Sequence, residues 1–438
     1  MRAATTTLQA AKTLGALLLL EAALPVSLAL TGAALLRSLV VTPARSTAAQ
    51  PRTVLLSGGK MTKALQLARS FHAAGHRVVM VESAAHRTTG HRFSRAVDSF
   101  HVVPPPTDPG YARALLEVVR AERVDVFVPV SSPVSSLYDA LAAPLLEPWC
   151  EVLHCDAEMI RTLDDKHAFG ELATSLGLPV PDAHRITRSE QVAAVETGGR
   201  EYVLKSIPYD PVNRLDLTPL PRPTALETAR FVRSKAVSPQ SPWVLQELVR
   251  GTEYCTHSTV RDGHIQVWCC CESSAFQVNY ASVDKPEIEA WVRAFVGPLG
   301  LTGQVSLDVM QTADGRVLPI ECNPRTHSAI TMFHDHPDLA RAYLEHDVPT
   351  VTPLPGSRPT YWVAHELWRM LSSPRQVPER MRVLLDGKDA VFAWDDPLPF
   401  LVLHHLHIPT LLLRNLWQGR GWIRIDFNIG KLVQAAGD

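Results

Sequence analysis

The chain lacks an excess of charge of either sign, a paired set of cysteines and any internal repeat. Its 438 residues carry 43 Lys and Arg against 44 Asp and Glu, so no basic surplus favours a nucleic-acid partner, and we expect none. The seven cysteines include the adjacent Cys269, Cys270 and Cys271 but no Cys-x-x-Cys pair. A strand would send these three side chains to alternating faces. We therefore predict buried, reduced thiols in a reducing compartment rather than a disulfide framework.

A long apolar run is present near the N-terminus. Residues 13–36 are numerous enough to cross a bilayer, although Glu21 and Pro25 weaken a spanning helix. A cleaved signal peptide fits less well, because the run is long and arginines follow it. We predict that residues 1–45 form a hydrophobic membrane segment, as a single anchor or as a monotopic hairpin broken at Pro25. The basic residues after it place the remainder on the cytoplasmic face of the membrane. Deleting residues 1–45 is then expected to release the protein from membranes and preserve its activity.

Residues 46–155 alternate short apolar strands with helices. A strand at 53–57, a Gly58-Gly59 turn and a helix at 60–74 lead to a second strand, which indicates a parallel α/β sheet. The turn lacks full Gly-x-Gly-x-x-Gly spacing and so is a weak dinucleotide signal. A loop at the carboxyl end of a first strand is nevertheless a favoured ligand position. Substrate contact and a purely structural turn both remain open for Gly58-Gly59.

Residues 156–346 form a second predicted domain with more antiparallel strands. Lys166 follows two aspartates at a helix, and Lys205 ends a short strand. An apolar strand at 243–249 precedes two predicted hairpins. The remaining residues, 347–438, form a C-terminal extension. Its apolar stretch at 397–417 is interrupted by histidines, so it either lies at the membrane interface or packs as a core helix.

The last hairpin of the second domain carries two opposed acids. Segments 303–311 and 316–322 alternate like strands around Asp314-Gly315, a favoured two-residue turn. With that turn, Met310 faces Pro319 and Asp308 faces Glu321. Like charges directly opposite each other repel, so a cation between the two acids would explain their presence. Two solvated surface acids are the alternative reading.

Two further polar residues follow on the same strand. Asn323 lies two residues beyond Glu321 and hence on the same face. Two carboxylates and an amide oxygen suit Mg²⁺ that is held partly by substrate phosphates. Arg325 supplies a planar fork for a phosphate group.

Taken in order along residues 53–345, the two lysines, the 243–249 strand and the acidic hairpin resemble the ATP-grasp superfamily. The resemblance implies an α/β (α+β) ATP-grasp fold with an N-terminal pre-ATP-grasp domain. It implies that Asp308, Glu321 and Asn323 hold one or two Mg²⁺ ions (Mn²⁺ being possible) and that Arg325 and Lys205 act in catalysis. The residues implied to bind ATP are Lys166 and Lys205 at the phosphates, the hinge Gln246, Glu247, Leu248 and Val249 at adenine, and Glu253 at the ribose.

A narrower resemblance concerns whole segments. SGGKMTKALQLARSFHAAGHRVV (57–79), LDDKHAF (163–169), CTHSTVRDG (255–263), IECNPRTHSAITMF (320–333) and GWIRIDFNIGKLV (421–433) resemble the ATP-grasp ligases of mycosporine-like amino acid biosynthesis, the mycosporine-glycine synthases. The resemblance implies that ATP phosphorylates the enol oxygen of 4-deoxygadusol and that glycine then displaces phosphate, giving mycosporine-glycine and ADP. Another ATP-grasp ligase joining an amine to a carboxylate, and a non-catalytic ATP-binding protein at a membrane, are the alternatives.

The chain departs from common ATP-grasp patterns in two places. The stretch after Lys205 contains no glycine, where many members have a glycine-rich loop over the phosphates. A lid there would use Arg214 or Asp216 to contact substrate. Ser306 stands where the D-alanine ligase branch has an arginine, which leaves oxyanion stabilisation unassigned. His327, just beyond Arg325, is a candidate for orienting substrate or phosphate.

Overall fold

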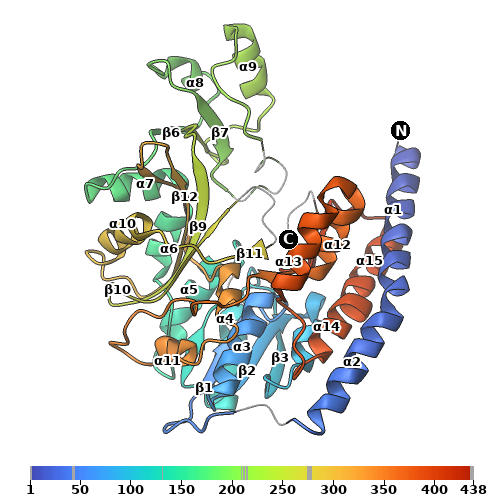
Figure 1. The fold of residues 1–438 in the computed structure, drawn as a ribbon. Helices are drawn as coiled ribbons and strands as arrows, with labels where there is room; N and C mark the ends of the chain where they lie inside the picture. The colour runs from blue at the N-terminus through green and yellow to red at the C-terminus, as the bar shows by residue number, and fades with distance from the viewer. Residues whose placement is uncertain are drawn as a thin grey trace.

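The computed structural model describes residues 2–41, 45–130, 132–208, 210, 213, 216–273 and 279–434. Helices α1 (Arg2–Ala22) and α2 (Leu24–Ser38) run along one side of the molecule, next to helices of the C-terminal part (Figure 1). Three sheets form the main framework among the described residues, together with a small three-stranded sheet and a two-stranded hairpin. The fold is a mixed α/β architecture, as predicted.

A five-stranded parallel sheet follows the N-terminal helices in the chain. In the order β3-β2-β1-β4-β5 its strands are Ser99–Val103, Arg77–Ser83, Thr53–Leu56, Val126–Val128 and Glu151–Val152. Leu56 and Met80 share a buried cluster with helix α3 (Thr62–Ala73). Leu55 and Val79 point to the other face, which is covered by α4 (Tyr111–Glu122) and α5 (Ser135–Leu146). Strand order reverses between β1 and β4, and the loops that follow these two strands flank the crevice where sheets of this type bind ligands.

Two antiparallel sheets form the middle of the chain. The smaller has the order β6-β8-β7, comprising Ala183–Ile186, Trp243–Glu247 and Tyr202–Ser206, and carries the short helices α8 (Gln191–Ala194) and α9 (Ala225–Arg233). The larger has the order β10-β9-β12-β13, comprising His264–Glu272, Thr252–Arg261, Gly303–Gln311 and Val317–Asn323. Aromatic packing of Phe169, Trp291 and Phe295 joins α7 (Lys166–Ser175) and α10 (Pro286–Val296) beside this sheet, next to α6 (Ala157–Asp164).

The acidic hairpin has the predicted pairing of Asp308 with Glu321, but it reaches this pairing by a different route. The Thr312 amide donates to the Arg316 carbonyl (3.0 Å), and Gly315 has φ +86°. The loop therefore has three residues instead of two, with glycine at its left-handed position. This moves Pro319 from Met310 to Val309, so the predicted Met310–Pro319 pairing is wrong. A β-bulge between Asp308 and Val309 then restores the Asp308–Glu321 pair.

The C-terminal part packs against the parallel sheet and the N-terminal helices. Its strands are β14 (Thr360–Tyr361) and β15 (Lys388–Asp389), which join β11 (Asn279–Tyr280), and the hairpin β16 (Arg424–Asp426) with β17 (Lys431–Val433). Its helices, after α11 (Leu339–Leu344), are α12 (Val363–Ser372), α13 (Val377–Asp386), α14 (Leu398–Val402) and α15 (Ile408–Trp417), with a π-helical turn at Leu403–His407. Leu403, Ile408 and Leu412 are fully buried, so the apolar stretch at 397–417 packs as core helices.

The N-terminal apolar run forms two consecutive helices and no hairpin. Ala23 between them keeps helical backbone angles, and the Ser27 amide donates to its carbonyl (3.1 Å). Pro25 lies in the first turn of α2, where a missing N–H costs no intrahelical hydrogen bond. The chain therefore continues in nearly the same direction (Figure 1), and the predicted break at Pro25 into a hairpin is wrong. Within the described residues, Thr7–Ser38 is the stretch long and apolar enough to cross a membrane.

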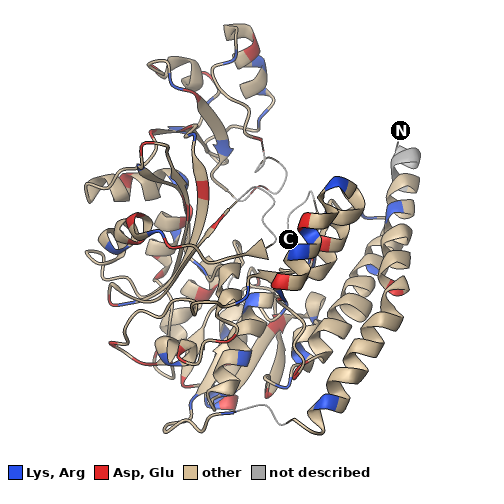
Figure 2. Cartoon of the chain, viewed as in Figure 1, with Lys and Arg blue, Asp and Glu red and all other residues tan. Residues whose placement is uncertain are grey.

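One side of this helix pair is docked on the C-terminal part. Helix α1 packs against α15, and α2 packs against α14. The Lys12 ammonium donates to the carbonyls of Trp422 (3.0 Å) and Ile423 (2.8 Å), and the Trp422 indole N–H donates to Thr13 (2.9 Å). Figure 2 shows few charged residues along α1 and α2. The helix pair is thus attached along its length to the folded protein. A membrane anchor joined only by a flexible linker would lack these contacts.

Candidate active site

A large cavity of about 1590 Å³ lies between the two antiparallel sheets, the parallel sheet and the C-terminal part. Typical small-molecule sites measure about 300 to 1,000 Å³, so this space has room for a nucleotide and a second substrate. Every predicted site residue lines it: Lys166, Lys205, Gln246, Glu247, Leu248, Val249, Glu253, Asp308, Glu321, Asn323 and Arg325. The fold thus gathers into one cavity side chains that are up to 159 positions apart, from Lys166 to Arg325.

The two opposed acids on β12 and β13 form the centre of the site. Glu321 forms an ion pair with the Lys166 ammonium (3.4 Å). Burial raises the pKa of Asp308 to about 7, with further contributions from Glu321 and Glu253. A carboxyl group in this setting is stabilised in its charged form by a cation placed beside it. The geometry therefore creates a demand for positive charge between Asp308 and Glu321.

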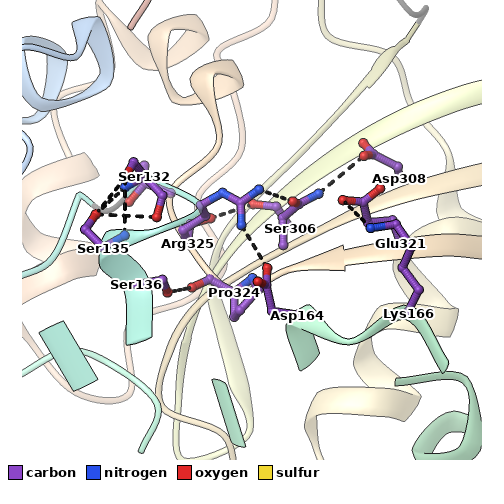
Figure 3. Close-up of polar contacts among 12 residues, drawn as sticks. Ser132, Ser135, Ser136, Asp164, Lys166, Ser306, Asp308, Glu321, Pro324 and Arg325 are labelled. Carbon is purple, nitrogen blue, oxygen red and sulfur yellow. Dashed lines mark hydrogen bonds and ion pairs between the residues drawn. The ribbon is translucent and has the colours of Figure 1, made fainter. Parts of the chain in front are cut away.

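The next residues of β13 connect this acidic pair to Arg325. The Asn323 amide nitrogen donates to Asp308 (3.3 Å), and its amide oxygen accepts from the Arg325 guanidinium. Arg325 also forms an ion pair with Asp164 (3.1 Å). Figure 3 shows Arg325 between the Ser132–Ser135 loop on one side and Asp308, Glu321 and Lys166 on the other. Asp164 was not singled out in the sequence, where nothing in its spacing linked it to Arg325.

The donor set fits Mg²⁺ only when the nucleotide supplies ligands as well. Among the described residues, no group of three or more His, Cys, Asp and Glu side chains could hold a metal ion. Asp308 and Glu321 are hard oxygen donors, and Asn323 becomes a third once its amide turns to present oxygen. Since Mg²⁺ prefers six oxygens and keeps several from water or phosphate, two acids and one amide suffice beside a polyphosphate.

Lys205 lies near the end of β7 and lines the cavity. Its ammonium donates to the Gln246 side-chain oxygen (3.2 Å), and the Gln246 amide nitrogen donates to the Ile320 carbonyl (3.0 Å). Burial lowers the pKa of Lys205, while Glu321 opposes that shift. Gln246 thus links the lysine strand to the acidic hairpin, a structural role in addition to the predicted hinge position.

The predicted adenine hinge is only partly available for pairing with a base. The Glu247 amide donates to the Asp182 carbonyl (2.8 Å), and the Leu248 amide donates to the Glu201 carbonyl (2.8 Å). The Val249 amide turns back onto the Glu247 carbonyl (3.1 Å). Of these three backbone donors, Val249 is the one without a neighbouring segment as partner, so we expect it to serve adenine.

The other predicted contacts divide between the cavity and its surroundings. Glu253 accepts from the Ser273 hydroxyl (2.9 Å) and lines the cavity, as a ribose contact requires. His327 also lines it, and burial with Lys63 and Arg325 lowers its pKa to about 3. Asp216 is engaged by Lys235 (2.5 Å), and Arg214 lies outside the described residues.

The structure has a parallel-sheet domain followed by two antiparallel sheets that enclose a cavity. This arrangement is the predicted α/β ATP-grasp fold, and two lysines and two opposed acids line its cavity. The chain is similar to an N5-carboxyaminoimidazole ribonucleotide synthetase solved as its ADP complex (TM-score 0.56, 13% identity, 77% of this chain and 88% of that chain). It is also similar to N5-carboxyaminoimidazole synthetase from Staphylococcus aureus (TM-score 0.53, 16% identity, 72% and 83%). Biotin carboxylase from Campylobacter jejuni, solved as a beta-gamma-ATP complex, is similar at TM-score 0.52 (13% identity, 68% and 72%). No family model and no curated protein sequence matches the chain.

Proposed function

We propose that the protein is an ADP-forming ligase. It uses ATP to phosphorylate an oxygen of the acceptor and then joins an amine to the carbon that carried this oxygen. The observation that carries this proposal is the facing pair Asp308 and Glu321, with Lys166 at 3.4 Å from Glu321, inside a cavity large enough for two substrates. Phosphoryl transfer requires positioning and charge neutralisation more than covalent chemistry from the protein. This arrangement supplies both.

Each side chain has a role that follows from its position. Asp308, Glu321 and Asn323 would hold Mg²⁺, which neutralises phosphate charge when bound. Lys166 and Lys205 act as point charges for the phosphates. Arg325 steadies the transferred phosphoryl group, and its ion pair with Asp164 (3.1 Å) fixes the guanidinium for that task.

For the substrates we propose 4-deoxygadusol and glycine, supported by the resemblance of segments 57–79, 163–169, 255–263, 320–333 and 421–433 to the mycosporine-glycine synthases. The enol of the cyclohexenone first loses its proton to solvent. The resulting enolate oxygen attacks the γ-phosphorus, the bond from that phosphorus to the ADP oxygen breaks, and an enol phosphate forms. The neutral amine of glycine then attacks the ring carbon, and phosphate leaves as the nitrogen gives up a proton. The products are mycosporine-glycine, ADP and phosphate.

A carboxylate substrate is the second candidate, and the similarity to N5-carboxyaminoimidazole ribonucleotide synthetase in fold supports it. The same side chains would then phosphorylate a carboxylate before amine attack. A non-catalytic ATP-binding protein would have no need to keep both Asp308 and Glu321 opposite each other.

Release of ADP by the purified full-length protein separates these three functions. Stimulation that requires 4-deoxygadusol together with glycine supports the proposed reaction. Stimulation by a carboxylate in place of 4-deoxygadusol supports the second candidate. Absence of ADP release with 4-deoxygadusol and with a panel of carboxylates, while MgATP still binds, would leave only the binding protein.

We also propose that the protein lies on the cytoplasmic face of a membrane through α1 and α2, as a monotopic protein. The sides of these helices that face away from the C-terminal part are apolar and exposed, at Leu14 (50%), Leu18 (73%), Leu28 (51%) and Leu36 (67%). Trp417 (86%) and Leu413 (54%) on α15 add to the exposed apolar surface of this part of the molecule. A helix pair docked on one side and apolar on the other suits the interface plane of one leaflet.

A further inference from the structure

The cavity continues beyond Arg325, away from the acidic pair. The Ser132 loop after β4 lies on that side of Arg325 (Figure 3), and α3 begins beside it because β1 and β4 are neighbours in the parallel sheet. We name this part the acceptor chamber. The residues that define it are Met61, Lys63, Ser132, Thr326 and Asn428.

A buried lysine is the main feature of the acceptor chamber. Lys63 is the second residue of α3 and is only 7% exposed, and its ammonium donates to the Thr326 carbonyl (2.5 Å). Burial, and then the charge of Arg325, lower the pKa of Lys63 well below its usual value. Two cationic side chains thus lie close enough to influence each other at this edge of the site. An anion placed between them favours the charged form of Lys63.

Two buried polar atoms of the chamber lack hydrogen-bond partners among the described residues. They are the hydroxyl oxygen of Thr326, a residue 1% exposed, and the side-chain oxygen of Asn428. Leaving a buried polar group without a hydrogen-bond partner is unfavourable, so each of these atoms is better satisfied when a ligand reaches it. The side-chain nitrogen of Asn428 donates to the Ser328 hydroxyl (2.7 Å), and the backbone carbonyl of Asn428 accepts from the Thr62 amide (2.9 Å). The C-terminal segment around Asn428 therefore closes the chamber over the start of α3.

We infer that Lys63, together with the Thr326 hydroxyl and Arg325, binds the oxyanion of the acceptor, the enolate or carboxylate oxygen that receives the phosphoryl group. This inference rests on the proposed function. The nucleotide phosphates lie at Lys166, Lys205 and the acidic pair. The acceptor oxygen therefore approaches the γ-phosphorus from the acceptor chamber, on the side of Arg325 away from the acidic pair. Lys63 holds the negative charge of that oxygen in place before the O–P bond forms.

The test compares Lys63→Met with Lys60→Met. Methionine keeps the length of the buried side chain without its charge, and Lys60 is a nearby lysine that pairs with Glu82 (3.8 Å) outside the chamber. In ADP-release assays with 4-deoxygadusol and glycine, we expect Lys63→Met to raise the KM for 4-deoxygadusol at least tenfold. The Kd for MgADP should stay within about twofold in both variants, and Lys60→Met should leave the KM near that of the wild type. Thr326→Val, which replaces the hydroxyl with a methyl group of similar size, should raise the same KM at least threefold.

A second arm does not depend on turnover. Orthophosphate is titrated by calorimetry into protein loaded with MgADP, as a probe of oxyanion binding. We expect Lys63→Met to weaken phosphate binding at least tenfold relative to Lys60→Met. If no acceptor supports ADP release but phosphate binding depends on Lys63, the proposed reaction fails and the oxyanion subsite stands. If neither the acceptor KM nor phosphate binding responds to Lys63→Met, the inference is overturned, whether or not the wild type turns over.

Discussion

At the scale of single residues, the protein concentrates unfavourable electrostatics where the proposed reaction needs them. Asp308 and Glu321 face each other across two strands, although like charges in that position destabilise a sheet. Lys63 is buried and Lys205 is half-buried, and burial lowers the pKa of both. Bound MgATP and an anionic acceptor would relieve each of these strains. Groups perturbed by burial and by specific charges in a cavity are typical of functional sites.

Replacing one acid tests the metal assignment. Glu321→Gln keeps the size of the side chain and removes its charge, so we expect ADP release to fall by about 100-fold or more, as when an electrostatic stabiliser of a transition state is removed. Asp314→Asn, at an exposed acid in the turn of the same hairpin, should retain wild-type turnover. A loss of ADP release supports the assignment when the circular dichroism spectrum of Glu321→Gln matches that of the wild type. Normal ADP release by Glu321→Gln would refute it.

The raised pKa of Asp308, about 7, gives the site a pH dependence. In an unfolded chain the pKa of this carboxyl group is about 4. Between the unfolded and folded pKa values the folded state holds more protons than the unfolded state, so its stability falls as pH rises. Mg²⁺ has to displace the Asp308 proton below about pH 7. We therefore expect the thermal shift produced by Mg²⁺ with ADP to be larger at pH 8 than at pH 6. Asp308→Asn should abolish this difference, and an equal shift at both pH values in the wild type would contradict it.

At the scale of secondary-structure elements, sequence pattern predicted strands β1 and β2 of the parallel sheet and the acidic pair. It predicted neither the edge strands β3 and β5 nor the local geometry of the hairpin. The alternation of 303–311 and 316–322 identified both strands. The three-residue loop and the bulge at Asp308/Val309 each shift the register by one residue in opposite directions, so the predicted pairing of Asp308 with Glu321 was right through compensation. Bulges depend on twist and on neighbouring strands, which a single strand's pattern does not encode.

Lys63 and Asn428 could not be found from the sequence for a related reason. A lysine in the first turn of a helix is ordinarily solvated, and Asn428 lies 365 positions further along the chain. Only the packing of the C-terminal segment over α3 brings them to one chamber.

The position of the hinge was predicted from the sequence, but its hydrogen bonds were not. The amides of Glu247 and Leu248 donate to the carbonyls of Asp182 and Glu201. These contacts depend on tertiary packing, which the strand pattern does not encode.

Docking of α1 on the segment that contains Trp422 changes the expectation for the N-terminus. The Lys12 ammonium lies 4.0 Å from the Trp422 ring and donates to two carbonyls there. Trp422→Ala should therefore destabilise the protein by about 3 to 5 kcal/mol and speed proteolytic cleavage within residues 7–41. Arg420→Ala, at an exposed neighbouring position, serves as the control and should leave both properties unchanged. Unchanged stability and protease resistance in Trp422→Ala would contradict the docking.

The same docking revises the expected effect of deleting residues 1–45. Helix residues Ala16, Leu20 and Ser27 line the cavity, so their removal opens one wall of the site and exposes the buried surfaces of α14 and α15. We now expect the truncated protein to lose activity as well as membrane binding. Full activity in a soluble truncated protein would contradict this revision.

At the scale of the whole molecule, the attachment of α1 and α2 bears on membrane topology. A spanning orientation would draw α14 and α15, which pack against the pair, into the hydrocarbon. An orientation in the plane of the membrane leaves both ends of the α1–α2 pair on the same side of the membrane. The described cysteines are all buried, so single cysteines introduced at Leu8 and Leu39, which are 71% and 81% exposed, can be labelled selectively. In inside-out vesicles, an impermeant maleimide should label both positions, and labelling of only one would indicate a spanning helix.

In the proposed reaction, ATP's terminal phosphoryl group passes to an oxygen of the acceptor before the amine attacks. This order of events can be measured by carrying out the reaction in unlabelled water with 4-deoxygadusol that contains ¹⁸O in its enol oxygen. We predict that the released phosphate contains one ¹⁸O atom for each ADP formed, as measured by mass spectrometry. Phosphate without ¹⁸O, formed together with ADP and the coupled product, would contradict it.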